Sequence, residues 1–143
     1  MWVQEFQRRI GHSEVIVAHL IGIVEDDVPR INLFMDTGDA TVEDMVKGTE
    51  RGVLVTRFHY ANIVNPIESS ITGMTRDGTF LIERGEVVGP VRNFRFTQSI
   101  LGALSTTSMV GRQAELASEF FFSASRVPAL KVEEFNFSGV SDH

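Results

Sequence analysis

The segment from Gly52 to Phe96 constrains the fold more strongly than any other part of the chain. Its first part has the two-residue period of a β-strand, which divides the side chains between one face (Val53, Val55, Arg57, His59) and the other (Leu54, Thr56, Phe58, Tyr60). Asn65-Pro66 interrupts this strand, and a second extended segment, Ser70 to Thr75, leads to Asp77-Gly78. Because Asp-Gly tolerates the positive φ angles of a tight turn, the sequence predicts a hairpin at Asp77-Gly78.

The rest of this segment predicts an antiparallel meander. Thr79 to Glu83 is expected to form the return strand, and Arg84-Gly85 supplies another turn. Two more extended pieces, Glu86 to Val88 and Val91 to Phe96, flank Gly89-Pro90, giving four or five strands in sequence. The predicted fold class is α+β, mostly β: an antiparallel meander sheet packed as a sandwich or partly open barrel, with two or three short helices.

Three segments have helical features. Apolar residues in Trp2 to Arg9 recur at helical spacing, which predicts a short amphipathic helix that Gly11 ends. Thr41 is typical of an N-cap and predicts a helix to about Glu50 with Gly52 as terminator; its buried side chains would be Val42, Met45 and Val46. A third helix, Gln98 to Leu104, is expected to bury one face made of Ile100, Leu101 and Leu104.

Further strands are expected on both sides of the meander. Upstream, Val15 to Val24 is apolar on both faces, as in an interior strand, and Ile31 to Met35 is a short strand. Downstream, Thr106 to Val110 and Ala129 to Phe137 are predicted strands, the second with a break at Glu133-Glu134 that is typical of a bulge.

One domain is predicted for residues 1–143, a length close to the modal domain size. The polar tail Ser138 to His143 is predicted to be disordered, and Glu119 to Ser123 fits either a buried strand or a loop that fills a gap. The formal charge of −6 argues against direct nucleic-acid binding. No apolar run reaches the ~18 residues of a membrane span, and no small-residue cleavage site follows Arg8-Arg9, so we expect a cytoplasmic protein.

The same central segment carries a family resemblance. The motifs TRFHY (56–60), NP (65–66) and TGMTRDGTFLIERGEVVGPVRNFRFTQS (72–99) resemble the C-terminal domain of the TldD/PmbA family, metallopeptidases also described as modulators of DNA gyrase. Flanking motifs are in the order that the family shows: NLFM (32–35) with Gly38-Asp39, SMVG (108–111), VPAL (127–130) and VEEF (132–135). The resemblance covers roughly Gly11 to Gly139.

Peptidases of this family hold zinc through two histidines of an HExxxH helix and a later cysteine, with the helix glutamate as general base. The chain has no HExxxH motif and no cysteine. His12 and His19 would lie about 10 Å apart on a helix, or on opposite faces of a strand, and His59 and His143 are isolated in the sequence. We therefore expect no cofactor in this chain, with zinc confined to full-length catalytic relatives, and no catalytic residue.

Four residues are candidates for lining a peptide-binding groove: Arg57, His59, Tyr60 and Asn65. In this interpretation an extended peptide adds as a strand to an exposed sheet edge beside Arg57 and His59. The alternative is that Arg57 pairs with one of the nineteen acidic residues on a solvated face. The phenylalanines of the chain, among them Phe94, Phe96 and Phe120 to Phe122, fit core packing or a subunit interface.

The resemblance implies a C-terminal domain of a peptide-processing or peptide-degrading system. The expected partners are a second copy of the chain or a catalytic TldD-like subunit, together with an extended peptide. The alternative is a stand-alone, metal-free interaction module that pairs with a catalytic subunit. A third interpretation is a remnant of a longer gene, which an HExxxH segment in the DNA upstream of Met1 would reveal.

Overall fold

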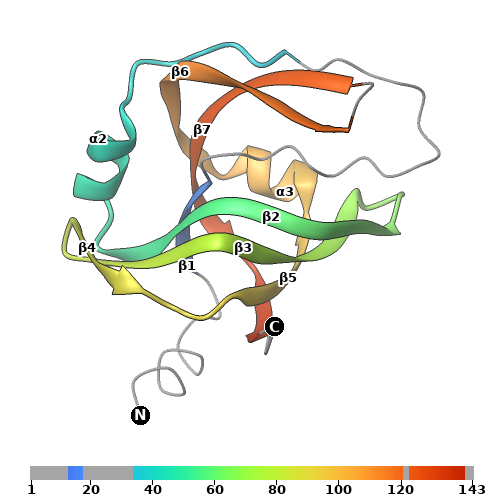
Figure 1. Cartoon of the computed structure of the whole chain (residues 1–143), viewed down its shortest axis with the longest axis horizontal. Coiled ribbons are helices and arrows are strands. Elements are labelled where there is room, and N and C mark those ends of the chain that lie inside the picture. The colour runs from blue at the N-terminus through green and yellow to red at the C-terminus, as the bar shows by residue number, and fades with distance from the viewer. Residues whose placement is uncertain (1–12, 18–33, 121–122, 141–143) are drawn as a thin grey trace.

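A computed structural model describes residues 13–17, 34–120 and 123–140 (Figure 1). At its centre lies the predicted meander, formed by β2 (Arg51–Asn65), β3 (Ser70–Glu83), β4 (Glu86–Pro90) and β5 (Phe94–Ser99). Strand β3 pairs antiparallel with β2 along one side and with β4 and β5 in succession along the other. An antiparallel meander is therefore confirmed, but Ser70 to Thr75 and Thr79 to Glu83, predicted as two strands, belong to the single strand β3.

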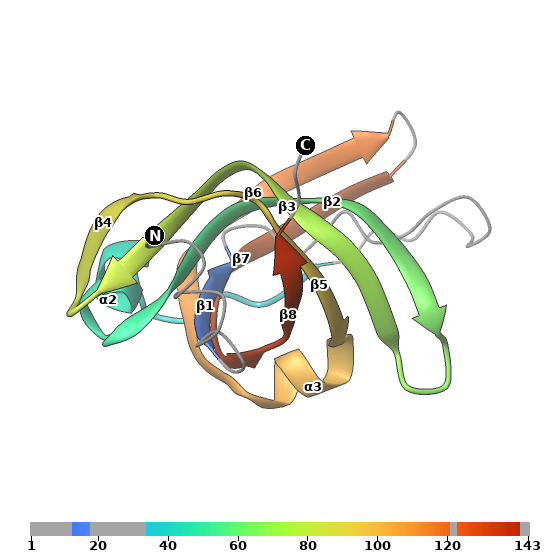
Figure 2. The same ribbon diagram turned by 90° about the horizontal axis from the view of Figure 1, so that it is seen from below.

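The other strands extend this meander into one curled sheet. They are β1 (Ser13–Val17), β6 (Thr107–Phe120), β7 (Ser123–Phe135) and β8 (Phe137–Val140). Within the described residues the order is β6-β7-β1-β2-β3-β5-β8, with β4 beside β3, and β1–β2 is a parallel pair. Only Asn136 separates β7 from β8, yet these strands lie near opposite edges, so the sheet must curl (Figure 2). The result is an open, strongly curved sheet of the predicted mostly β class.

The predicted hairpin at Asp77-Gly78 is wrong, because these residues lie inside the continuous strand β3. Val55 pairs with Thr79 and Arg57 pairs with Arg76, so two residues of β3 face the single residue Thr56 of β2. This is a β-bulge. Asp77 has φ 62° and Gly78 has φ 149°. The positive φ angles that the dipeptide favours are thus used to bulge a strand instead of reversing the chain.

The chain reverses at Pro66 to Ser69 instead. The Asn65 side-chain oxygen accepts a hydrogen bond from the Ile67 backbone N–H at 3.1 Å, and the Ser69 N–H donates to the Pro66 carbonyl at 3.3 Å. The other predicted turn is confirmed: Arg84 (φ 51°) and Gly85 (φ 79°) join β3 to β4.

The first described helix, α2 (Val42–Lys47), begins as predicted and ends earlier. Thr41 and Asp44 form a capping box, in which the Asp44 N–H donates to the Thr41 hydroxyl and the Asp44 carboxylate accepts from the Thr41 O–H and N–H. These two hydrogen bonds, the side-chain one first, hold the pKa of Asp44 below its ordinary value. Gly48 caps the C-terminus, whereas the predicted terminator, Gly52, lies in β2.

The buried faces of the two described helices are smaller than predicted. In α2 only Met45 is fully buried, Val46 is half-buried and Val42 is exposed. The second, α3 (Ile100–Ser105), begins at the Ser99 cap and buries Ala103, while Leu101 and Leu104 are exposed and Ile100 only packs at the core margin. Each helix has six residues and so presents little more than one turn to the core. No described helix has the length and apolar character needed to cross a membrane.

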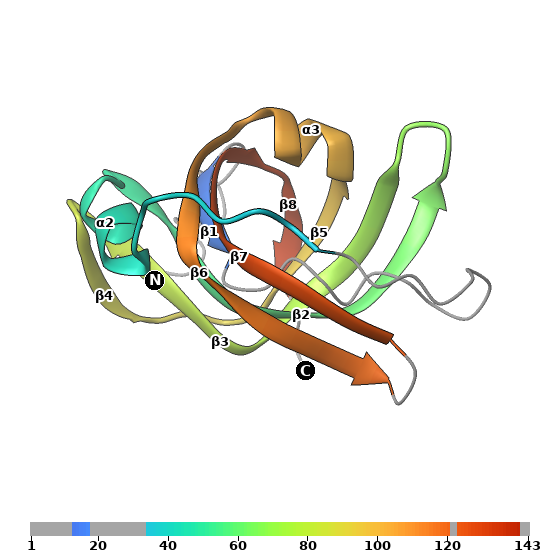
Figure 3. The same ribbon diagram turned by 90° about the horizontal axis from the view of Figure 1, so that it is seen from above.

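The downstream strands are longer than predicted. Of the predicted strand 106–110, residues 107–110 are the start of β6 and Thr106 caps α3; β6 pairs with β7 in a hairpin that extends from the body of the molecule (Figure 3). Of the ambiguous segment 119–123, Glu119 and Phe120 end β6 and Ser123 begins β7; residues 121–122 lie outside the described residues. The bulge at Glu133-Glu134 is confirmed, because Val132 and Phe135 pair with Val15 and Ser13, leaving two residues opposite one.

The predicted disorder of the tail is wrong for residues 138–140, which belong to β8. This strand pairs with β5, and its Phe137 and Val140 pack at the core, so the segment is ordered although Ser138 and Gly139 between them have small side chains. Residues 141–143, the predicted helix at 2–9 and most of the predicted strand at 15–24 lie outside the described residues. Of the predicted strand 31–35, Phe34 forms an isolated bridge with Arg126.

A cluster of phenylalanines fills the concave side of the sheet. Phe58 lies 4.7 Å from Phe96 and 5.6 Å from Phe135 between ring centroids, and Phe137 contacts Phe94 and Phe135 at 5.1 and 5.2 Å. All five are at most 9% exposed. These rings come from β2, β5, β7 and β8, so their burial holds together strands that are distant in sequence. Core packing is thereby confirmed for Phe94 and Phe96.

Candidate functional site

The bulge between β2 and β3 determines where the predicted groove residues lie. Val55 and Phe58 are both buried in the core, and the two residues between them, Thr56 and Arg57, both lie away from it. The prediction that Arg57 shares a face with Val55 is wrong, because the bulge shifts the alternation of β2 at this point. Arg57 therefore lies on the convex, solvent side of the sheet, and His59 follows it on that side.

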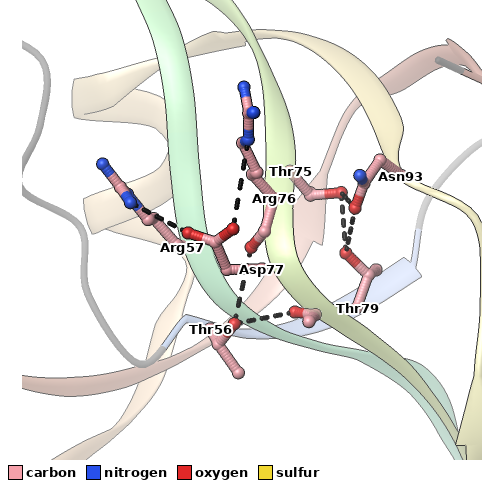
Figure 4. Close-up of polar contacts among 8 residues, drawn as sticks. Thr56, Arg57, Thr75, Arg76, Asp77, Thr79 and Asn93 are labelled. Carbon is pink, nitrogen blue, oxygen red and sulfur yellow. Dashed lines mark hydrogen bonds and ion pairs between the residues drawn. The ribbon is translucent and has the colours of Figure 1, made fainter. Parts of the chain in front are cut away.

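Arg57 forms an ion pair with the bulge residue. Its Nη1 lies 2.8 Å from Asp77 Oδ2, while the Nε of Arg76 lies 3.9 Å from Asp77 Oδ1 (Figure 4). The three side chains are 46 to 54% exposed. An exposed pair of this kind contributes about 0–1 kcal/mol to stability. The pairing of Arg57 with an acidic residue on a solvated face, the second interpretation of the sequence, is thus observed.

His59 and Tyr60 lie at a second irregularity of β2. His59 pairs with Met74 and Asn62 pairs with Thr72, so two residues of β2, Tyr60 and Ala61, face one residue of β3. Tyr60 has φ 50°, is 63% exposed and has its ring 4.2 Å from that of His59. A bulky residue at positive φ costs on the order of 1–3 kcal/mol and persists only where its surroundings impose it.

Asn65 has a local role at the far end of β2. Its side-chain oxygen accepts hydrogen bonds from the N–H groups of Ile67 and Glu68, at 3.1 and 3.4 Å, and so shapes the turn. The four predicted groove residues are consequently spread along β2 from the first bulge to the turn. Arg57 and His59 share the outer face, His59 contacts Tyr60, and Asn65 lies apart from them.

A buried polar cluster behind the bulge was not predicted. We call it the threonine network: Thr75, Thr79 and Asn93 (Figure 4). Thr79 Oγ1 donates to Thr75 Oγ1 at 2.7 Å, Thr75 Oγ1 donates to Asn93 Oδ1 at 3.4 Å, and the Phe94 N–H donates to Thr75 Oγ1 at 2.9 Å. Thr75 and Thr79 are 0 and 2% exposed. The sequence signal for this cluster is that Thr75 and Thr79, on either side of Asp77-Gly78, are polar residues at core-facing positions. The strand alternation alone does not reveal that they face the core.

The convex side of the bulge is also closed by a threonine. The Thr56 hydroxyl donates to the Gly78 carbonyl at 2.9 Å, across the two strands. The bulge is therefore anchored from both sides of the sheet, by Thr56 on one and the threonine network on the other. A fixed bulge of this kind orients the charged side chains beside it.

The described residues contain no group of three or more His, Cys, Asp or Glu side chains arranged to hold a metal ion. His59 is the one histidine within them, and its ring contacts Tyr60. His12, His19 and His143 lie outside the described residues. The site on β2 and β3 is thus a surface of arginines, a histidine and a tyrosine over a buried hydroxyl network, suited to binding through hydrogen bonds and charge.

Comparison with known families gives a match over most of the chain. The model of the PmbA/TldA metallopeptidase C-terminal domain matches residues 27–139, which include the whole of this site. The chain belongs to the TldD/PmbA family. No curated protein matches it.

Solved structures share the fold of this TldD/PmbA domain. They include TldE from Thermococcus kodakarensis (25% identity, TM-score 0.62, 74% of this chain covered) and a candidate DNA gyrase modulator from Bacteroides thetaiotaomicron (29%, 0.61, 75%). A candidate DNA gyrase modulator from Thermotoga maritima has the same fold at 20% identity and TM-score 0.61, with 75% of this chain covered. The match spans 23, 23 and 24% of those three chains, so this chain corresponds to about a quarter of their length.

Proposed function

We propose that this chain acts as the non-catalytic C-terminal domain of a TldD/PmbA-type system that processes or degrades peptides in the cytoplasm. The observation that carries the proposal is the family match over residues 27–139 in a chain that has neither HExxxH nor cysteine. A zinc peptidase needs three protein ligands that converge on one ion and leave a position for water. Within the described residues no such set of His, Cys, Asp or Glu side chains is present, so we assign the cutting step to another polypeptide or to another part of a longer one.

The contribution of this domain, in the proposal, is to bind or orient an extended peptide on the outer face of β2 and β3. Arg57 and His59 supply side-chain donors there, and Tyr60 supplies an exposed aromatic ring beside them. The predicted addition of the peptide to an exposed edge at Arg57 and His59 does not fit β2, which lies between β1 and β3, so on this face side chains would hold the peptide instead of backbone hydrogen bonds. Asn65 belongs to this proposal through the turn that it shapes at the end of β2.

A second candidate is a stand-alone interaction module that pairs with a catalytic TldD-like subunit or with itself. The exposed apolar residues at the end of the β2–β3 hairpin favour it: Ile63, Val64 and Ile67 are 56, 58 and 94% exposed. Clustered exposed apolar side chains of this size often mark protein contacts. Light scattering of the chain alone, and after co-expression with a catalytic subunit, separates a self-associating module from one that needs the subunit.

The test of the main proposal combines metal content and peptidase activity. We expect the purified chain to hold no stoichiometric zinc by elemental analysis and to leave an unstructured peptide intact, while a mixture with a catalytic TldD-like subunit cleaves that peptide. Zinc bound to the isolated chain, with hydrolysis that a chelator abolishes, would contradict the proposal. Equal cleavage by the catalytic subunit with and without this chain would remove the role assigned to the domain.

A further inference from the structure

The outer face of the sheet concentrates positive charge on a chain whose formal charge is −6. Three arginines lie on it, Arg57 on β2, Arg76 on β3 and Arg95 on β5, and we call this surface the arginine face. In the strand segments that form it, residues 57–62, 72–77 and 94–98, the one acidic residue is Asp77. Counting these side chains, the face carries a formal charge of +2 from three arginines and one aspartate.

The strand register brings the three arginines together. Arg57 is directly opposite Arg76, and Arg95 is directly opposite Met74, two residues from Arg76 on the same strand. Directly opposed residues have Cβ atoms about 5 Å apart and diagonal ones about 7–8 Å apart, so the three guanidinium groups are within reach of one ligand. Phe58, on the opposite side of β2, is buried in the core, as are Phe94 and Phe96 on either side of Arg95. The alternation thus fixes the arginines outward.

This arrangement has an electrostatic cost that the fold only partly relieves. Like charges directly opposed across two strands are destabilising. Asp77, which the bulge inserts beside both, lies 2.8 Å from Arg57 and 3.9 Å from Arg76 and offsets one of the charges. Within residues 34–120 and 123–140, no carboxylate is paired with Arg95, which is exposed. The face therefore retains capacity for at least one more carboxylate.

We propose that the arginine face binds an acidic segment of an extended polypeptide. Guanidinium groups bind carboxylates through paired, charge-assisted hydrogen bonds, and Met74, opposite Arg95 and two residues from Arg76, offers an apolar contact for a side-chain stem. The inference rests on the proposed function in one respect, namely that the ligand is a polypeptide. It adds that the bound segment is acidic. Nucleic acid is less favoured, because three arginines neutralise few phosphates and the rest of the chain is acidic.

The test uses a fluorescein-labelled oligo-glutamate peptide and the full chain, with binding followed by fluorescence anisotropy at low salt. Arg95→Gln is expected to weaken binding roughly threefold, and Arg76→Gln with Arg95→Gln about tenfold, since an exposed ion pair changes an equilibrium constant by a factor of roughly 1.5 to 5. Arg112→Gln, an exposed arginine on β6, removes the same charge elsewhere and should leave the affinity nearly unchanged. Far-UV circular dichroism confirms that each variant folds.

A second pair of variants tests the role of the bulge carboxylate. Asp77→Asn removes the internal competitor and keeps a residue that tolerates positive φ, so it should tighten binding about threefold. Glu43→Gln, on the exposed side of α2, changes the net charge by the same amount and should leave the affinity for oligo-glutamate unchanged. If Arg95→Gln and Arg112→Gln changed the affinity equally, and Asp77→Asn and Glu43→Gln did so too, binding would depend on net charge alone. That result would overturn the proposal.

Two other probes separate the alternatives. An oligo-glutamine peptide should not bind, and a single-stranded oligothymidine should bind more weakly than oligo-glutamate. Tighter binding of oligothymidine that depends on Arg76 and Arg95 would replace the polypeptide by nucleic acid. Absence of oligo-glutamate binding, combined with peptide cleavage that requires this domain in the reconstituted system, would reject this inference and leave the proposed function standing.

Discussion

Replacing Thr75 by valine removes one hydroxyl from the threonine network and keeps the size and branching of the side chain. The Thr75 hydroxyl, fully buried, accepts hydrogen bonds from the Phe94 N–H at 2.9 Å and from the Thr79 hydroxyl at 2.7 Å. Thr79 can turn to Asn93 Oδ1, which is 3.2 Å away, but the Phe94 N–H loses this acceptor. A buried donor deprived of its acceptor costs about 1–3 kcal/mol, so we expect Thr75→Val to lower the free energy of unfolding by about 2 kcal/mol.

Urea denaturation followed by far-UV circular dichroism measures this change. With a slope of about 2 kcal/mol per molar urea, the midpoint should fall by roughly 1 M while the slope stays the same. Thr75→Ser keeps the hydroxyl and loses one methyl group, which costs about 1 kcal/mol. Thr97→Val, which removes an exposed hydroxyl on β5, should change stability by less than about 0.5 kcal/mol. If Thr75→Val is as stable as the parent, or more stable than Thr75→Ser, the network does not stabilise the fold as argued.

Two further predictions concern the bulge and the first helix. Gly78 has φ 149°, and Gly78→Ala would place a Cβ 2.9 Å from both the Phe80 ring and the Thr56 hydroxyl. The substitution should therefore lower the free energy of unfolding by roughly 1–3 kcal/mol. An unchanged urea midpoint would show that the bulge tolerates a side chain. Thr41→Ala removes the hydroxyl that lowers the pKa of Asp44 most, so this pKa, followed by NMR titration, should rise toward that of an ordinary aspartate. Because the folded-state pKa is depressed, the associated stability is present above the unfolded-state pKa and lost as the pH falls through the folded-state value, and Thr41→Ala should weaken this acid dependence.

Local features of the fold could be read from the sequence because they depend on neighbouring residues. Alternation located β2 and the second half of β7, the Arg84-Gly85 turn follows from the φ preferences of a short segment, and the Thr41 cap needs only a hydroxyl and a carboxylate three residues apart. The break at Glu133-Glu134 was visible as a fault in the same alternation. The helix ends were less predictable, since Gly48 and Gly52 are both suitable terminators.

For the candidate site, the sequence supplied the residues and the tertiary structure supplied their arrangement. Arg57 and His59 were identified from their position in a strand, but the side of the sheet on which Arg57 lies depends on a bulge that appears only when β3 pairs with β2. The sequence did not identify Arg95 as a site residue, because its proximity to Arg76 comes from pairing between β3 and β5.

The sequence by itself determined that this chain is mostly β, that it forms a meander and that it carries neither an HExxxH motif nor a cysteine. Only the tertiary structure decided that Asp77-Gly78 bulges a strand, that Thr75 and Thr79 share a buried network, and that β8 continues β7 on the other side of the core. The physical reason is that φ preference and side-chain period are properties of a few adjacent residues. Strand register, burial and the distances between charged side chains depend on which strands pair, and strand pairing is determined by the packing of the whole core.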